Sequence, residues 1–168
     1  MKRIYILLFL LLVVSVASQA GTTARKKLNF NAGWRLFVGD EPKAVEATYD
    51  DSQWQQVTLP YAFNGDEAFR KDIVDLTDTI CWYRKTFKVE SLKLKVSKFF
   101  IEFEGVRQGA DFYLNGHHLG FSENGVMACG FDLTPYIKAG ENVLAVRCDN
   151  SWTYRGPTLW QPLPVERP

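Results

Sequence analysis

Glu102 and Glu104 are two carboxylates at positions i and i+2 in the run F-F-I-E-F-E. A retaining glycosidase needs two carboxyl groups about 5–5.5 Å apart, in environments that separate their pKa values. On a strand, residues i and i+2 share one face of the sheet and lie roughly 6.8 Å apart. Both glutamates fall in the polar phase of an alternating run, where water would keep both ionised. The pattern favours a solvated sheet face, and we predict no catalytic residues in this chain.

His117 and His118 are the two histidines of the chain. Adjacent residues on a strand point to opposite faces, so the two rings cannot bind one metal ion together without a bend. The spacing of the cysteine and acidic residues does not complete a zinc site. We therefore predict no metal site and no other cofactor.

Polar side chains occur beside aromatic ones in two stretches, a combination that suits sugar recognition. A sugar site needs hydrogen-bonding groups next to an aromatic ring that can stack on the C–H surface of the sugar. The first stretch places Asn64 and Asp66 close to Tyr61 and Phe63, and the second runs from Asp149 to Tyr154. We predict substrate contacts from Asn64, Asp66, Asp149, Asn150 and Trp152.

A simpler interpretation exists for some of these polar residues. Asp149 and Asn150 follow a strand-like run, and both residue types commonly end a strand by satisfying a turn. The sequence leaves the binding role and the turn role open for these two residues. For Glu67 it favours the purely structural role.

The stretch from Phe99 to Gly120 predicts the central antiparallel unit that must position these groups. Apolar and polar residues alternate with period two on both sides of Gly105, which is typical of half-buried strands. Asn115-Gly116 predicts a tight hairpin, because a type I′ turn needs positive φ at both central residues. The core expected from this alternation and from a later strand comprises Phe99, Ile101, Phe103, Phe112, Leu114, Leu144 and Val146.

Other segments supply the remaining strands. Aromatic and β-branched content, with turn residues between the runs, predicts strands within residues 28–38, 53–59, 81–89, 118–121, 129–133 and 142–148. Residues 39–51 are predicted to be a surface loop, and 61–79 to be a long loop that is either functional or disordered. With no clear 3.6-residue period, the fold class is all-β, an antiparallel β-sandwich or jelly roll.

The two ends of the chain differ from its middle. Lys2 and Arg3, an apolar run to Ala17 and the site Ser18-Gln19-Ala20 predict a signal peptide over residues 1–20. The apolar run is shorter than the roughly 20 residues that a bilayer requires, so we expect a secreted or periplasmic protein with no membrane span after removal of the signal. Residues 21–27 are predicted to be a flexible lead-in, 28–155 the β-sandwich, and 156–168 a proline-rich irregular tail.

Charge and cysteine content exclude some functions. The chain has 20 basic and 19 acidic residues, which argues against binding to nucleic acid or to an anionic membrane. Its three cysteines, Cys81, Cys129 and Cys148, cannot all pair within the chain. Buried small hydrophobic residues are the simpler interpretation, and one bridge with one free thiol is the alternative.

Eight motifs in order along the chain resemble one known family. They are F-N-A-G-W, D-D-S-Q-W, V-T-L-P, W-Y-R-K-T-F, F-E-G-V, L-N-G-H-H-L-G, D-L-T-P-Y-I and G-E-N-V-L-A-V-R-C-D-N. Together they resemble the N-terminal sugar-binding domain of glycoside hydrolase family 2, in the β-galactosidase branch of secreted gut-bacterial enzymes. The resemblance covers residues 28 to about 155.

The resemblance implies a galactose-binding-like jelly roll. In the family, this domain precedes an immunoglobulin-like sandwich and a TIM barrel that holds both catalytic glutamates, and its loops reach the rim of the sugar pocket. After S-W-T-Y-R, family members continue into a further strand, whereas this chain becomes proline-rich. We therefore expect the downstream domains to be missing and the chain alone to be inactive.

The function expected from the sequence is that of the sugar-binding domain of a secreted β-galactosidase-like glycoside hydrolase, with a β-galactoside-type ligand. A stand-alone, non-catalytic carbohydrate-binding module and a generic adhesion sandwich are the alternatives. A titration with a galactoside would separate the carbohydrate-binding module from the adhesion sandwich.

Overall fold

A computed structural model of the chain describes residues 25–67, 78–90 and 97–151. The chain divides into two units, residues 1–30 and 31–168, and the strands that the structure describes belong to the second unit. The predicted signal peptide and the proline-rich tail lie outside the described residues. Within those residues, no helix has the length and hydropathy that a membrane crossing requires.

The described part of the chain is built almost entirely from antiparallel strands, which confirms the predicted fold class. A short 3-10 turn, η1 (Pro42–Val45), lies between the first two strands. The strands are β1 (Trp34–Val38), β2 (Gln55–Val57), β3 (Ile80–Val89), β4 (Phe100–Phe103), β5 (Gly109–Leu114), β6 (His117–Ser122), β7 (Cys129–Asp132) and β8 (Gly140–Asp149).

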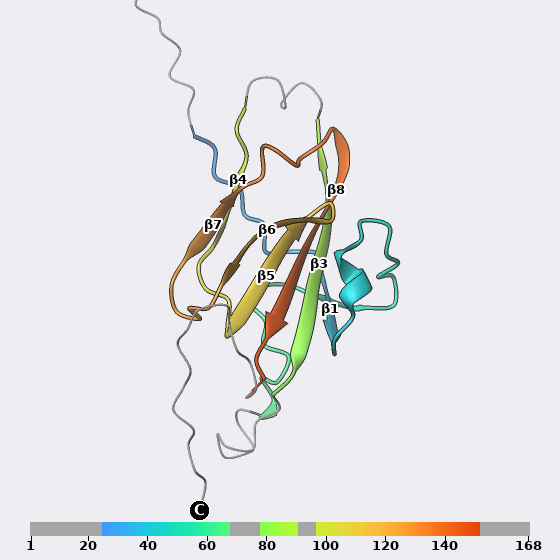
Figure 1. Ribbon diagram of the computed structural model, residues 1–168, viewed down its shortest axis with the longest axis vertical. Coiled ribbons are helices and arrows are strands. Elements are labelled where there is room, and N and C mark those ends of the chain that lie inside the picture. The colour runs from blue at the N-terminus through green and yellow to red at the C-terminus, as the bar shows by residue number, and fades with distance from the viewer. Residues whose placement is uncertain (1–24, 68–77, 91–96, 152–168) are drawn as a thin grey trace, which may run out of the picture. The chain divides into compact units, whose positions relative to one another are not determined.

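The strands form two sheets, which Figure 1 shows as a broad ladder with a narrow ribbon beside it. The larger sheet has six strands in the order β2-β1-β3-β8-β5-β6, and the smaller sheet pairs β4 with β7. At the centre of the larger sheet, β3 and β8 pair over ten residues, from Ile80↔Asp149 to Val89↔Gly140. Consecutive residues from Asn142 to Val146 are all buried, so β8 is covered on both faces.

The inner face of the larger sheet packs against β4 and β7. Phe112 is fully buried between Phe103 and Phe131, with ring centroids 4.8 and 4.6 Å apart. Of the expected core, Phe112, Leu114, Leu144 and Val146 are buried, whereas Phe99, Ile101 and Phe103 are only half-buried. The reason is that β4 belongs to a sheet of only two strands. Neither strand has a neighbour on its outer side, so the side chains of this sheet are only partly covered. The predicted alternation of β4 is confirmed, since Phe100 and Glu102 are exposed.

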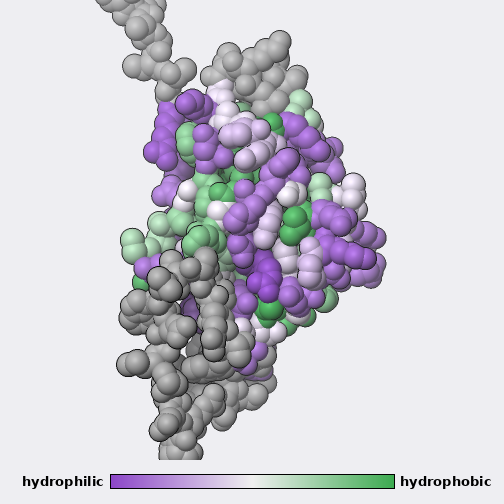
Figure 2. Space-filling view, viewed as in Figure 1, coloured by the Kyte–Doolittle hydropathy of each residue, from purple (hydrophilic) through white to green (hydrophobic). Residues whose placement is uncertain are grey.

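The outer face is covered by the segment between β1 and β2. Ala44 of η1 is fully buried with Trp82 and Ala145, and Trp54 stacks on Phe37 at 5.3 Å. The prediction of a plain surface loop over residues 39–51 is therefore wrong in part. A single buried alanine in a polar segment gives no periodic signal, so the sequence did not reveal this contact. The surface visible in Figure 2 is mainly polar, with scattered apolar patches.

The predicted Asn115-Gly116 turn joins β5 to β6, with φ of 52° and 87° at the two residues. Positive φ at both positions is the signature of a type I′ turn, which confirms the prediction. The Asn115 amide donates to Tyr136 O and to Asn142 Oδ1, both at 2.9 Å. Asn142 also bonds with Lys138 N, Lys138 O and Gly140 O, which ties the hairpin to the start of β8.

Candidate functional site

The end of β8 and the start of β3 meet at one end of the larger sheet. Asp149 lies opposite Ile80, and the Asn150 backbone N–H donates to Thr79 O at 3.1 Å. Thr79 is the last residue of the long loop that the sequence predicts over residues 61–79. The predicted residues Asp149 and Asn150 therefore lie directly beside the exit of that segment.

The Asp149 carboxylate is held by the chain that follows β8. It accepts hydrogen bonds from the Ser151 backbone N–H at 3.0 Å and from Ser151 Oγ at 2.6 Å. Arg147 Nη1 lies 3.5 Å from the other oxygen, Oδ2. This is the turn role that the sequence left open, and it also fixes where the carboxylate points. The Asn150 side chain forms no hydrogen bond within the described residues and is half-buried.

Arg147 connects this strand end to the loop after β1. Its guanidinium donates to both oxygens of Asp40, each at 3.2 Å, and Trp82 Nε1 donates to Asp40 Oδ1 at 3.3 Å. The hydrogen bond from Arg147 holds the pKa of Asp40 below its usual value, although burial opposes the effect. An ionised Asp40 is an acceptor and cannot serve as a general acid. The sequence contained one clue to the contact between Arg147 and Asp149, because residues i and i+2 of a strand share one face of the sheet.

The first predicted stretch approaches the opposite face of the sheet. Tyr83 Oη donates to Tyr61 O at 3.1 Å, and Gln55 Nε2 donates to Tyr61 Oη at 3.1 Å. Tyr83 pairs with Val146 on the inner face, whereas Trp82 and Arg147 pair on the outer face. The hydrogen bond from Glu67 N to Asn64 O at 3.1 Å closes a turn in this stretch, and Asp66 is exposed.

The two stretches are thus anchored near the same end of β3 but on opposite faces. A sugar in contact with both would lie across the strand ends, not on either face. We define the rim as the predicted substrate-contact residues that the structure describes, namely Asn64, Asp66, Asp149 and Asn150. Trp152, the predicted aromatic contact, lies outside the described residues.

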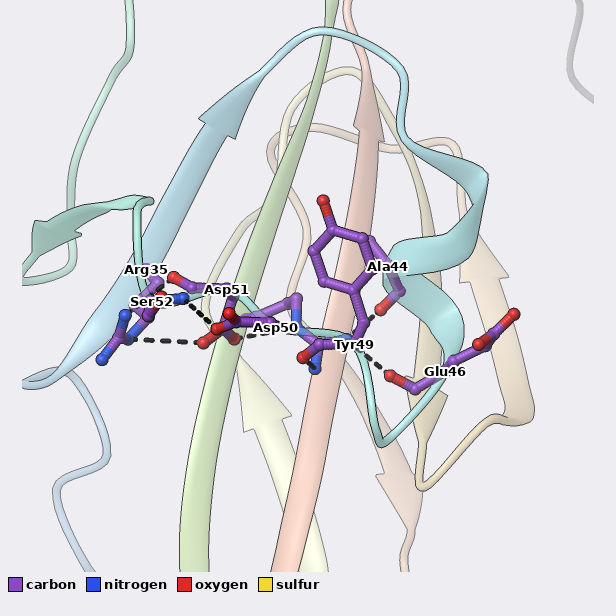
Figure 3. A network of polar contacts seen from close by, with 8 residues as sticks. Arg35, Ala44, Glu46, Tyr49, Asp50, Asp51 and Ser52 are labelled. Atoms are coloured by element: carbon purple, nitrogen blue, oxygen red, sulfur yellow. Dashed lines mark hydrogen bonds and ion pairs between the residues drawn. The ribbon is translucent and has the colours of Figure 1, made fainter.

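A second polar region lies on the outer face, around the buried guanidinium of Arg84. Its Nε donates to Asp51 Oδ2 at 2.9 Å, and its other nitrogens donate to the carbonyls of Ala44, Glu46 and Tyr49. Figure 3 shows these acceptors together with Arg35, whose Nη1 donates to Asp51 O at 2.7 Å. The backbone N–H of Ser52 donates to Asp50 and lowers the pKa of that carboxyl.

A polar hollow of about 250 Å³ opens beside this network. Its lining comprises Gly33, Arg35, Asp51, Gln56, Arg84 and Thr86. The donors of Arg84 are directed at protein oxygens, so this guanidinium fastens the 44–51 segment to the sheet. The region therefore works as a structural clamp, and the rim is the better candidate for ligand binding.

The glutamates and histidines that could have carried catalysis or metal binding are not among the rim residues. Glu102 and Glu104 are both exposed. His118 Nε2 lies 2.9 Å from Asp111 Oδ1, and His117 stacks on Tyr136 at 4.6 Å. Within the described ranges, the His, Cys, Asp and Glu side chains form no group of three that could hold a metal ion.

Comparison with known proteins defines the class of this β-sandwich. The family model for the sugar-binding domain of family 2 glycosyl hydrolases matches residues 40–159. A β-glucuronidase of Formosa agariphila is 39% identical over 138 residues, with 77% of this chain and 14% of that protein covered. A β-galactosidase of Bacteroides ovatus is 36% identical over 143 residues, with 80% of this chain and 17% of that protein covered.

Solved structures give the same result. The crystal structure of a Bacteroides uniformis β-glucuronidase superposes with a TM-score of 0.71 at 27% identity, over 77% of this chain and 15% of that one. The chain belongs to glycoside hydrolase family 2, of which it carries the sugar-binding domain. It spans about a sixth of the length of these relatives, and the family predicted from the motifs is confirmed.

Proposed function

We propose that this chain is the sugar-binding domain of a secreted family 2 β-glycosidase and that its rim contacts the substrate. The observation that carries the proposal is the meeting of Asn150 and Thr79 at one end of the sheet, where Asp149 is already oriented by Ser151. Loops on a rigid scaffold are the usual carriers of binding groups. An oriented carboxylate next to an uncommitted amide can accept from and donate to the hydroxyl groups of a sugar.

The proposed ligand is a β-galactoside, with a β-glucuronide as the competing substrate, since the relatives carry both names. The charge of the rim favours the neutral sugar. Asp66 is exposed and Asp149 is half-buried, and two carboxylates would repel the carboxylate of a glucuronide.

The proposal assigns binding to this domain and leaves hydrolysis to other parts of a family 2 enzyme. Glu102 on β4 and Glu104 just after that strand are both exposed, whereas the paired carboxyl groups of a glycosidase flank the bond that they cleave. We therefore expect the purified chain to release no product from an aryl galactoside above the buffer background. The proposal also includes removal of residues 1–20 during secretion.

Calorimetric titration of the chain with phenyl β-galactoside and phenyl β-glucuronide tests the proposal. Asp149→Ala and Trp152→Ala should each weaken galactoside binding by about 1–3 kcal/mol. Glu141→Gln is the matched control, because Glu141 is an exposed acid at the opposite end of β8. Unchanged affinity in both alanine variants would rule out the rim and the predicted contact of Trp152. Tighter binding of the glucuronide would reverse the choice of substrate.

A further inference from the structure

Two buried thiols face one another across the central strands of the larger sheet. Cys81, the second residue of β3, is the register partner of Cys148, the penultimate residue of β8. Their exposed fractions are 2% and 4%, and both thiols are free in the structure. The third cysteine, Cys129, is half-buried in the other sheet, on β7.

The positions of the two cysteines fit a covalent bridge. Directly opposite residues of an antiparallel pair have Cα atoms about 4.5 or 5.5 Å apart, and both values lie within the range of about 4.4–6.8 Å found for disulfides. The hydrogen bond from Asn150 N to Thr79 O shows that Thr79 and Asn150 form a hydrogen-bonded pair that continues the β3–β8 ladder. Because hydrogen-bonded pairs alternate with non-bonded ones, Cys81 and Cys148 form a hydrogen-bonded pair, the wider of the two kinds.

This wider spacing makes a bridge possible but strained. The Cβ atoms of such a pair start at about 5.5 Å, whereas a disulfide brings them to about 3.8 Å. Closing that gap must pull the ends of β3 and β8 together. Strained disulfides are more easily reduced than unstrained ones.

We propose that Cys81 and Cys148 form a reversible cross-strand disulfide by exchange with a low-molecular-weight disulfide, while Cys129 stays outside the bridge. The Cys81 thiolate attacks one sulfur of the small disulfide and releases one small thiolate. Cys148 then gives up its proton to solvent and attacks Sγ of Cys81, which releases the second thiolate. Two cysteine thiols are oxidised and the small disulfide is reduced to two thiols, so atoms and electrons balance.

The environment of the pair supports this order of events. A hydrogen bond from the Cys148 thiol lowers the pKa of Cys81, although burial opposes the effect. The same hydrogen bond, together with burial, raises the pKa of Cys148. Cys81 is thus the attacking thiol, and Cys148 resolves the mixed disulfide. Both lie one residue from a strand end, where local opening costs least and can admit a small disulfide.

The bridge would act on the same end of the sheet that carries the rim. Asp149 and Asn150 directly follow Cys148, and Thr79 lies two residues before Cys81. A covalent link between β3 and β8 would hold these backbone segments at a fixed separation. The inference is nevertheless independent of sugar binding and can fail or succeed without it.

Peptide mapping in glutathione buffers tests the proposal. The purified chain is equilibrated at several ratios of oxidised to reduced glutathione, approached from both directions, and then quenched with acid, denatured, alkylated and digested with trypsin. With oxidised glutathione in excess, we expect most molecules to yield a linked Cys81–Cys148 peptide that lacks two hydrogens. With reduced glutathione in excess, we expect both cysteines to be alkylated.

Single variants sharpen the result. Cys129→Ser should retain the bridge, and Cys148→Ser should replace it with a glutathione adduct at Cys81. If Cys148→Ser does not fold, the map of the unchanged chain still decides the question. Alkylation of both Cys81 and Cys148 under oxidising conditions, a bridge that includes Cys129, or a bridge that persists at equilibrium in excess reduced glutathione would each overturn the proposal.

Discussion

Strand β8 has an asparagine near its start and another just past its end, and the fold treats them differently. Asn142 is fully buried, and its amide is satisfied by Asn115, Lys138 and Gly140. Asn150 is half-buried, and within the described residues only its backbone takes part in hydrogen bonding. The same side chain thus serves as an internal fastener at one end of the strand and stays available at the other. The difference indicates which polar residues build the sandwich and which can meet a ligand.

Loss of the Arg84 guanidinium should have the largest effect on stability. Arg84→Met leaves the carboxylate of Asp51 and three backbone carbonyls without their buried partner. We expect the free energy of unfolding, measured with urea, to fall by about 3–5 kcal/mol. Arg35→Met is the control, since the Arg35 side chain is 41% exposed, and it should cost less than about 1 kcal/mol. Equal losses in the two variants would mean that Arg84 is not the clamp.

Replacement of the two asparagines at the ends of β8, Asn142 and Asn150, should change stability by clearly different amounts. Asn142→Ala leaves several buried groups unsatisfied and should lower the free energy of unfolding by about 2–3 kcal/mol. Asn150→Ala removes no hydrogen bond of the described side chains and should stay within about 0.5 kcal/mol of the parent. Urea unfolding measures both values. A large loss of stability in Asn150→Ala would mean that Asn150 is also a structural residue, which would contradict the proposed difference between the two asparagines.

The ion pair between Asp40 and Arg147 should have the smallest effect, visible in the pH dependence of stability. The pKa of Asp40 is lowered in the folded protein, so its contribution is present above the ordinary aspartate value of about 3.9 and is lost as pH falls through the folded value. Because Asp40 is 42% exposed, the effect should be small. In a plot of the unfolding midpoint against pH, Asp40→Asn should reduce the slope on the acid side. An unchanged slope would show that the Asp40–Arg147 ion pair adds nothing to stability.

The sequence predicted local features better than contacts between distant segments. Period-two alternation located β4 and β5, and Asn115-Gly116 gave the turn, because these signals lie within a few neighbouring residues. The clamp joins Arg84 to Asp51, 33 positions away, and no local pattern encodes that partner. Asn142 was also missed as a fastener, since its partners come from two separate turns.

Prediction of the rim was limited for a related reason. The residue types predicted a sugar site, and the strand end brings Asn150 beside Thr79. The sequence did not show that Tyr61 and Asp149 are anchored on opposite faces of the sheet. That arrangement depends on the register of β3 with β8, which is set by pairing across 51 to 69 positions.

The most direct test of the account is a map of backbone amide shifts in the isotope-labelled chain during titration with phenyl β-galactoside. The account predicts shifts at Asn64, Asp66, Thr79 and Asn150, with none at Asn115 and Asn142. Shifts that cluster around the hollow between Arg35 and Gln56, or no shifts at saturating sugar, would contradict it.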